Sequence, residues 1–227
     1  MNTLEDDLQR ARELAIDELA DAIETIGFEC TRCGACCKAA DCEDEGKSEP
    51  HTATIFPDEV REIAEDDAYD WRDVARPMPY GLTAGEDGPE GETFEWALQT
   101  DDCGDCTFYS EGDSPGSGKC AVYGTRPLIC RTYPFSVALD GSTQPMGEAI
   151  DQEGIVRVHE CEGVGRDISR EDAMELAATL KKRAVRELEE AIAVSEQYTP
   201  AEDDDGRVIV HDSEGEKYLD GTPVEDR

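Results

Sequence analysis

Apolar residues at the start of the chain recur at steps of three or four, which is the periodicity of an amphipathic helix. The pattern covers residues 3–26, with Thr3 and Asp6 spaced as a capping box and Gly27 as a natural stop. Its apolar stripe consists of Leu4, Leu8, Ala11, Ala15, Leu19, Ala22 and Ile26. We therefore predict one long helix that packs one face on the core.

The same periodicity returns near the end of the chain. Ser169 and Asp172 form a second capping-box pattern, and the helix that they open is predicted to run over residues 169–198. Its buried stripe is predicted to contain Ala173, Leu176, Leu180, Ala184, Leu188 and Ala191. The two helices would flank the middle of the chain.

Short alternating runs and turn residues between these helices predict small elements. Strands are expected at residues 53–56, 93–99, 106–109 paired with 120–123, 136–139 and 155–159. Short helices are expected at 57–66, 69–75 and 126–131, an exposed loop at 81–92, and a weak hairpin at 208–210 and 217–219. The fold class is therefore α+β, with two long flanking helices around a centre of loops and short strands. We expect an N-terminal helix (1–27), a central domain (28–165), a C-terminal helix packed on that domain (166–198), and an acidic tail or edge hairpin (199–227).

Charge narrows the choice of partners and environment. The 227 residues contain 56 Asp and Glu against 21 Lys and Arg, a net charge of −35. An acidic surface repels phosphate backbones and anionic lipids, so neither nucleic acid nor membrane is an expected partner. The acids are spread along patterned segments, which favours a folded acidic protein of a high-salt, halophilic cytoplasm over a disordered chain. The N-terminus lacks the features of a secretory signal, so a cytoplasmic location is expected.

Ten cysteines are the main candidate chemistry. In a reducing cytoplasm such a count indicates metal or redox chemistry rather than disulfides. The first group reads Cys30-Thr-Arg-Cys33-Gly-Ala-Cys36-Cys37, and two-residue spacers allow thiolates to converge on one point. The adjacent pair Cys36 and Cys37 would point in different directions, so the two could face different metals, or one of them could be a spare thiol.

Acidic residues avoid the segments in which most cysteines lie. Residues 30–40 and 114–139 contain no acid, although about six would fall in the longer window at the average for the chain. The basic residues of the two windows are Arg32, Lys38, Lys119, Arg126 and Arg131. Metal-bound thiolate is anionic, so nearby cations would favour it and carboxylates would oppose it. Burial of these windows would also explain the lack of acids.

The cysteine motifs resemble the CxxCxxCC cysteine-cluster family, a zinc- or iron-chelating domain. Its pattern of F-x-CxxCGxCC, a C-x-F strand, C-x-x-Y-x-x-RP-x-x-CR-x-[FY]-P and a late cysteine before glycines is found here between residues 28 and 165. The resemblance implies that eight cysteines are metal ligands: Cys30, Cys33, Cys36, Cys37, Cys106, Cys120, Cys130 and Cys161. Cys42 and Cys103 fall outside it, and could be extra ligands or ordinary thiols.

Three functions remain open from the sequence. The first is an iron–sulfur protein, with [4Fe–4S] favoured, in redox or cofactor chemistry; the second is a structural zinc module for interactions; the third is a metal-handling protein. Arg126 and Arg131 are expected near the cofactor, as donors to ligand sulfurs or loop carbonyls. The chain contains no P-loop, Rossmann, H-E-x-x-H or G-x-S-x-G motif, and a C-x3-C-x2-C pattern fails at Ala40.

The charge generates a first prediction. The protein should need roughly molar salt to fold, because the Debye length rises from ~3 Å at 1 M to ~10 Å at 0.1 M and leaves −35 charges poorly screened. Circular dichroism against KCl concentration measures this. Full cooperative structure at 0.1 M salt would contradict it.

Overall fold

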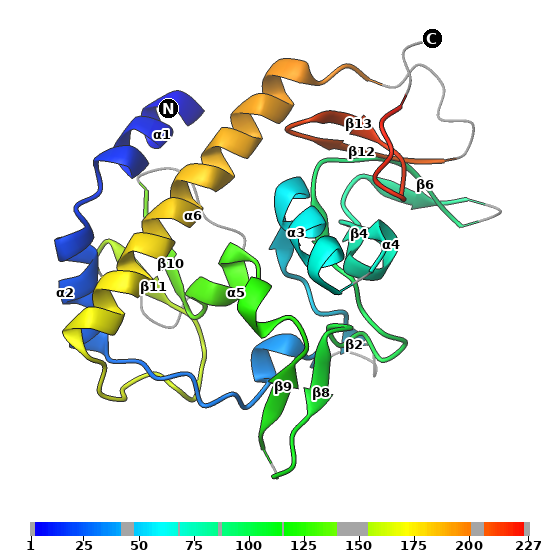
Figure 1. Ribbon diagram of the computed structural model, residues 1–227. Helices are drawn as coiled ribbons and strands as arrows, with labels where there is room; N and C mark the ends of the chain where they lie inside the picture. The colour runs from blue at the N-terminus through cyan, green and yellow to red at the C-terminus, as the bar shows by residue number, and fades with distance from the viewer. Residues whose placement is uncertain are drawn as a thin grey trace. The chain divides into compact units, whose positions relative to one another are not determined.

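The computed structural model describes residues 3–41, 48–67, 69–85, 88–114, 116–139, 154–200 and 207–224 (Figure 1). It has helices and several small sheets, so the predicted α+β class is confirmed. The chain divides into two compact units. Unit 1 comprises residues 1–35, 111–118 and 128–192, and unit 2 comprises residues 36–110, 119–127 and 193–227.

The N-terminal segment of unit 1 forms two helices instead of one. Helix α1 (Leu4–Glu13) begins at the predicted capping box, and α2 (Ile16–Ile26) ends at Gly27, whose φ is 76°. The prediction of a single helix was wrong because Leu14 leaves helical geometry, with φ −52° and ψ 126°. Its carbonyl accepts a hydrogen bond from Lys181 Nζ at 2.8 Å, which satisfies one of the acceptors at this helix end.

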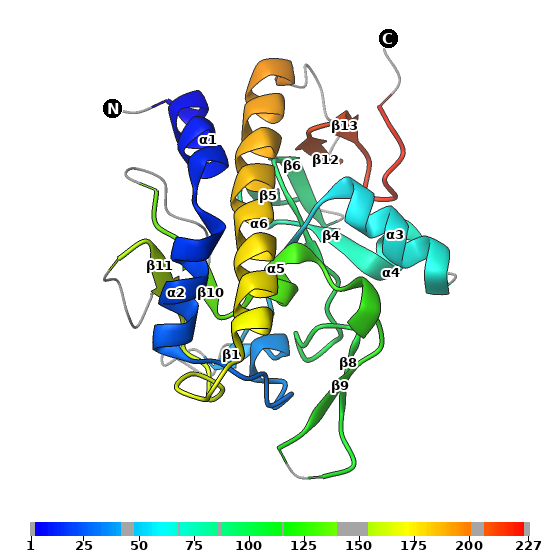
Figure 2. The same cartoon turned by 60° about the vertical axis from the view of Figure 1, so that its left-hand side comes forward.

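Helix α6 (Arg170–Gln197) confirms the second long helix. The hydroxyl of Ser169 accepts from the backbone N–H of Asp172 at 3.1 Å, which satisfies one of the donors at the helix start. Helices α1 and α2 run beside α6, and strands β10 (Phe135–Val137) and β11 (Val156–Val158) pair antiparallel in the same unit (Figure 2). Their apolar side chains form one core, which includes Leu19, Ile23, Phe135, Val158, Leu180 and Leu188.

A buried arginine joins α6 to α5 (Leu128–Thr132), the helix that carries Cys130. Arg183 is fully buried, and its guanidinium donates to the Thr132 hydroxyl at 3.0 Å and to the Phe135 carbonyl at 3.3 Å. Its Nε donates to Glu187 at 2.7 Å. A buried charge is tolerated only when it is paired and hydrogen-bonded, so these contacts determine where α5 lies in unit 1.

The first sheet of unit 2 contains two of the predicted strands and a third, at residues 75–77, that was not predicted. Strand β7 (Trp96–Leu98) lies between β3 (Thr54–Ile55) and β4 (Ala75–Pro77), and both pairings are antiparallel. Helices α3 (Pro57–Asp67) and α4 (Trp71–Val74) confirm the short helices expected in this region.

The second sheet of unit 2 overturns the predicted exposed loop at 81–92. That region contains β5 (Leu82–Ala84) and β6 (Pro89–Thr93), an antiparallel pair. Strand β6 also pairs in parallel with β12 (Val208–Asp212), and β12 pairs with β13 (Gly215–Lys217) in the predicted C-terminal hairpin. The glycines and acids of this region show no strand pattern in the sequence. A partner strand more than 100 residues away, with buried Val208 and Val210, supplies the apolar packing instead.

A buried polar cluster holds the C-terminal hairpin in unit 2. The carboxylate of Asp212 accepts from the indole N–H of Trp96 at 2.9 Å and lies 2.9 Å from Lys217 Nζ. Asp212 and Lys217 are both buried. Each charge therefore has a partner in the sheet, as burial requires.

The remaining elements are short and lie near cysteines. They are η1 (Ala35–Cys37), β1 (Ala40–Asp41), β2 (Ser48–Glu49), β8 (Tyr109–Glu111), β9 (Gly118–Cys120) and η2 (Tyr123–Thr125). The strand pair predicted at 106–109 and 120–123 is present but displaced, because β8 and β9 pair nearer the connecting loop and share only Tyr109 and Cys120 with the predicted ranges. None of the helices in the described ranges combines the length and the apolar character needed to cross a membrane.

His51 provides a pH-dependent test of unit 2. Its backbone N–H donates to the Gly104 carbonyl at 2.7 Å, and its own carbonyl accepts from Arg76 at 2.9 Å. Burial, and then the charge of Arg76, lower the pKa of His51 to about 4, against a smaller opposing effect of Asp105. Because an unfolded histidine titrates near ~6.5, the folded state binds fewer protons between these values. The contribution of His51 to stability is therefore complete above about pH 6.5 and is lost as the pH falls towards 4.

We expect the difference in free energy of unfolding between wild type and His51→Gln to change over this pH range and to stay constant above it. Wild type should lose stability relative to the variant by up to about 1.4 kcal/mol per pH unit, the limit for one proton. Denaturant unfolding in high salt at a series of pH values measures this difference. Parallel pH profiles for the two proteins would contradict the assignment.

Candidate metal centre

The two compact units divide the eight cysteines of the motif into equal sets. Unit 1 contains Cys30, Cys33, Cys130 and Cys161, and unit 2 contains Cys36, Cys37, Cys106 and Cys120. The nine cysteines of the described ranges, which include Cys103, carry thiols rather than disulfides. Cys42 lies outside the described residues.

A short antiparallel contact brings Cys30 and Cys161 into one neighbourhood of unit 1. Phe28 forms a β-bridge with Val164, and the Glu29 N–H donates to the Gly163 carbonyl at 3.0 Å. The Thr31 hydroxyl bonds to the carboxylate of Glu162. The Cys161 sulfur accepts from the Gly163 N–H at 3.4 Å, a contact that stabilises a thiolate.

Gly163 allows these two segments to approach. A Cβ at this position would lie 2.3 Å from the Glu29 carbonyl oxygen and 3.1 Å from the Phe28 ring. Only a residue without a side chain therefore fits at this distance. The sequence marked the glycines after Cys161 only as part of the motif, and this packing role is visible only in the structure.

The turn between Cys30 and Cys33 uses unusual backbone geometry. Arg32 has φ 57° and Gly34 has φ 79°, both in the left-handed region. The Arg32 carbonyl accepts from the Gly118 N–H at 2.5 Å. These conformations turn the chain sharply around the Cys33 thiol.

Cys130 lies in unit 1 on helix α5, and the Arg183 contacts stabilise the position of this helix. The Tyr133 hydroxyl donates to the Glu160 carbonyl, and the His159 N–H donates to the Pro134 carbonyl at 2.9 Å. The end of α5 is therefore bonded to the residues directly before Cys161. His159, two residues before Cys161, is buried with its Nε2 2.9 Å from the Ser136 hydroxyl.

The unit 2 set begins with two neighbouring thiols. The sulfurs of Cys36 and Cys37 lie 4.0 Å apart at the end of η1, so the adjacent residues do not point in opposite directions. The S–H contact with Cys37 and then burial raise the pKa of Cys36. The Cys37 carbonyl accepts from the Cys106 N–H at 2.8 Å, which attaches this turn to the segment before β8.

Cys106 and Cys120 complete the unit 2 set. The Ala121 N–H donates to the Phe108 carbonyl at 2.9 Å, so the segments that hold the two cysteines run together. Burial raises the pKa of Cys106 to about 11, and the charges of Cys120 and Cys36 add to this effect. Burial also raises the pKa of Cys120, with Cys36 contributing. Neighbouring thiols of this set therefore raise the pKa of Cys36, Cys106 and Cys120, and metal binding would have to displace their protons.

Arg126 lies where its charge acts on this set. It lowers the pKa of both Cys36 and Cys120, opposing the effect of burial. Its guanidinium stacks 3.8 Å from the Tyr123 ring centroid, and its Nε donates to the Tyr123 carbonyl at 3.1 Å. Arg131 is exposed on α5 in unit 1. Of the two arginines expected near the cofactor, Arg126 is the one whose charge acts on thiols of the unit 2 set.

A tight loop next to this set was not predicted. The Asp101 carboxylate accepts from the N–H groups of Cys103 and Asp105, at 2.9 and 3.1 Å, and Gly104 adopts φ 86°. The Asp105 carboxylate accepts from the Ala39 N–H at 2.8 Å, which fixes the chain just after Cys37. The aspartates at 101, 102 and 105 around Gly104 were the available signal. Cys103 itself is exposed on this loop.

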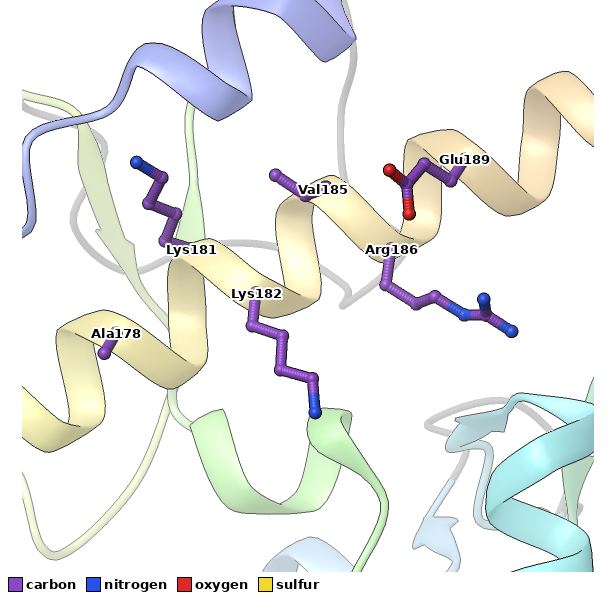
Figure 3. A pocket seen from close by; sticks show the side chains of 6 residues that line it. All are labelled: Ala178, Lys181, Lys182, Val185, Arg186 and Glu189. Carbon is purple, nitrogen blue, oxygen red and sulfur yellow. The ribbon is translucent and has the colours of Figure 1, made fainter.

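A shallow groove elsewhere in unit 1 contains no cysteine. It has a volume of about 350 Å³. Figure 3 shows its lining residues along α6, which are Ala178, Lys181, Lys182, Val185, Arg186 and Glu189. Lys181 already donates to the Leu14 carbonyl, and Arg186 pairs with Glu190 at 3.5 Å. Protonated lysine and arginine side chains do not ligate metal ions, so this groove is not a candidate metal site.

The thiols are grouped but not yet assembled around a point. Across the described ranges, no three or more Cys, His, Asp or Glu side chains converge closely enough to hold a metal ion as they stand. The donor set of each unit is nevertheless four thiols, which is a complete ligand set for tetrahedral zinc or a [4Fe–4S] cluster. The donor chemistry fits such a group, and closure of the ligands would accompany binding.

Comparison with known proteins agrees with this chemistry. A family model named CxxCxxCC, described as a putative zinc- or iron-chelating domain, matches residues 29–162 and so covers more than half of the chain. Searches of curated proteins and of solved structures returned no match.

The close approach at Gly163 can be tested against a glycine in open space. Gly163→Ala should lower the free energy of unfolding by about 1–3 kcal/mol, because the new methyl group overlaps the Glu29 carbonyl. Gly124→Ala is the matched control, since no atom lies within 4 Å of its added Cβ, and it should change stability by under about 0.5 kcal/mol. Denaturant unfolding in high salt compares them. Equal stability of the two variants would argue against the approach described.

Proposed function

Because the chain belongs to the CxxCxxCC family of zinc- or iron-chelating domains, we propose that it carries iron–sulfur chemistry with a redox or cofactor role. The proposed ligands are Cys30, Cys33, Cys36, Cys37, Cys106, Cys120, Cys130 and Cys161. The observation that carries the proposal is the pure thiol character of the donor sets in both units. Thiolates are the usual ligands of iron–sulfur clusters, and such a cluster would supply a site for electron transfer or substrate activation.

The charges of the described residues suit an anionic metal–thiolate centre. The Arg126 charge acts on Cys36 and Cys120, and Lys38 lies 5.2 Å from the Tyr109 ring in the same unit. Cations beside an anionic iron–sulfur–thiolate unit stabilise it and favour its reduction. We propose Arg126 as the residue with this role in unit 2, and Arg131 as its counterpart in unit 1.

Zinc is the alternative cofactor, since four thiolates also form a closed structural zinc site. In that case the protein would be an interaction module or a metal-handling protein. We further propose a cytoplasmic, high-salt setting in which neither nucleic acid nor membrane is a partner, because the −35 charge would repel both.

Anaerobic purification in high salt tests the proposal. The protein should be brown, with broad visible absorption, and should contain iron with acid-labile sulfide. Elemental analysis of protein from its native host makes the comparison. Stoichiometric zinc without iron would contradict the iron–sulfur proposal and would support the structural zinc module instead.

A further inference from the structure

We infer that the eight cysteines form two separate four-thiolate centres, one in each compact unit, and that the C-x2-C-x2-C-C motif is shared between them. The inference rests on the proposed function, in which these cysteines bind metal. The unit 1 centre would use Cys30, Cys33, Cys130 and Cys161, and the unit 2 centre would use Cys36, Cys37, Cys106 and Cys120.

The division of the motif is the first argument. Spacing alone would place Cys30, Cys33 and Cys36 on one metal, as in a compact cysteine knuckle. The boundary between the units instead falls between Ala35 and Cys36, so the motif supplies two thiols to each unit. The neighbouring sulfurs of Cys36 and Cys37, 4.0 Å apart, are close enough for both to reach one centre.

Hydrogen bonds of neighbouring residues link the segments of three unit 1 cysteines, Cys30, Cys130 and Cys161. The Phe28–Val164 bridge and the Glu29–Gly163 bond align the segment of Cys30 with that of Cys161. The Tyr133–Glu160 bond attaches the end of the Cys130 helix to the same segment. Three distant parts of the sequence therefore meet in unit 1, each with a thiol.

Unit 2 has an equivalent set of links. The bond between the Cys106 N–H and the Cys37 carbonyl is 2.8 Å long, and the bond from the Ala121 N–H to the Phe108 carbonyl is 2.9 Å. Together they join the turn of Cys36 and Cys37 to the segments of Cys106 and Cys120. Arg126 then supplies a cation to this set, whereas Arg32 and Arg131 belong to unit 1.

Two four-thiolate centres leave no protein ligand unused and no open position on a tetrahedral metal. Such closed sites favour electron transfer or structural roles over direct binding of substrate. This closure distinguishes the arrangement from a single centre with four spare thiols, which would be free to exchange metal.

Paired substitutions test the division through metal content. In wild type we expect two centres per chain, and in Cys33→Ser or Cys120→Ser half of the metal. The double variant Cys33→Ser/Cys130→Ser, within unit 1, should keep the same half. The double variant Cys33→Ser/Cys120→Ser, across the units, should keep none.

Other outcomes separate the two proposals. Wild type with no metal would remove the proposed function itself. Wild type with one centre, or a within-unit double variant with no metal, would overturn the division and leave metal binding standing. Cys103→Ser is the matched control, because Cys103 is exposed and lies outside both sets, and it should keep all the metal.

A measurement on unmutated protein covers variants that do not fold. During graded removal of metal by a chelator, alkylation followed by mass spectrometry reports which thiols become reactive together. We expect the four unit 1 cysteines to react as one group and the four unit 2 cysteines as another. Joint release of Cys33 with Cys36, in step with all other ligands, would overturn the inference.

Discussion

Repulsion between negative charges is the constraint that the rest of this structure has to satisfy. A chain with a net charge of −35 has to fold while its carboxylates repel one another, and the proposed thiolate ligands would add further negative charge. Carboxylates are therefore absent from the sequence around most of the thiols, and Arg126 acts directly on Cys36 and Cys120. Where acids are buried, as at Asp212, they have a cation and a hydrogen-bond donor beside them. The buried Arg183 in unit 1 likewise has a partner of opposite charge, Glu187, and a hydrogen-bond acceptor, Thr132.

Backbone hydrogen bonds between distant segments, rather than regular sheets, position the cysteines. Among the nine cysteines that the structure describes, only Cys120 lies in a strand and only Cys130 in an α-helix, while Cys36 and Cys37 end a short 3-10 turn. The others lie on loops held by single contacts, such as Glu29 with Gly163 and Cys37 with Cys106. Loops of this kind can close around a ligand without repacking the core, which suits a protein whose thiols converge when metal binds.

Metal binding and folding are coupled in such an arrangement. Burial and neighbouring thiols raise the pKa of Cys36, Cys106 and Cys120, so without metal these thiols are protonated at neutral pH. Metal binding would release their protons and join the resulting thiolates to a cation. The helices α1, α2 and α6 carry a core in unit 1 that does not depend on those bonds.

Local chemistry in the sequence determined the elements with strong signals: the capping boxes at Thr3 and Ser169, the length of α6, the short strands around the cysteines and the thiol-rich character of the site. These features depend on neighbours within a few residues, so periodicity and spacing reveal them. Three features were decided only by tertiary structure. Helix α1 ends at Glu13 where the Leu14 carbonyl gains Lys181 as a partner, and residues 82–84 and 89–93 become strands in a sheet in which β12 pairs with β6. The cysteine motif divides between two units. Each depends on a segment far away in the chain, and sequence spacing carries no information about contacts that close only when the chain folds.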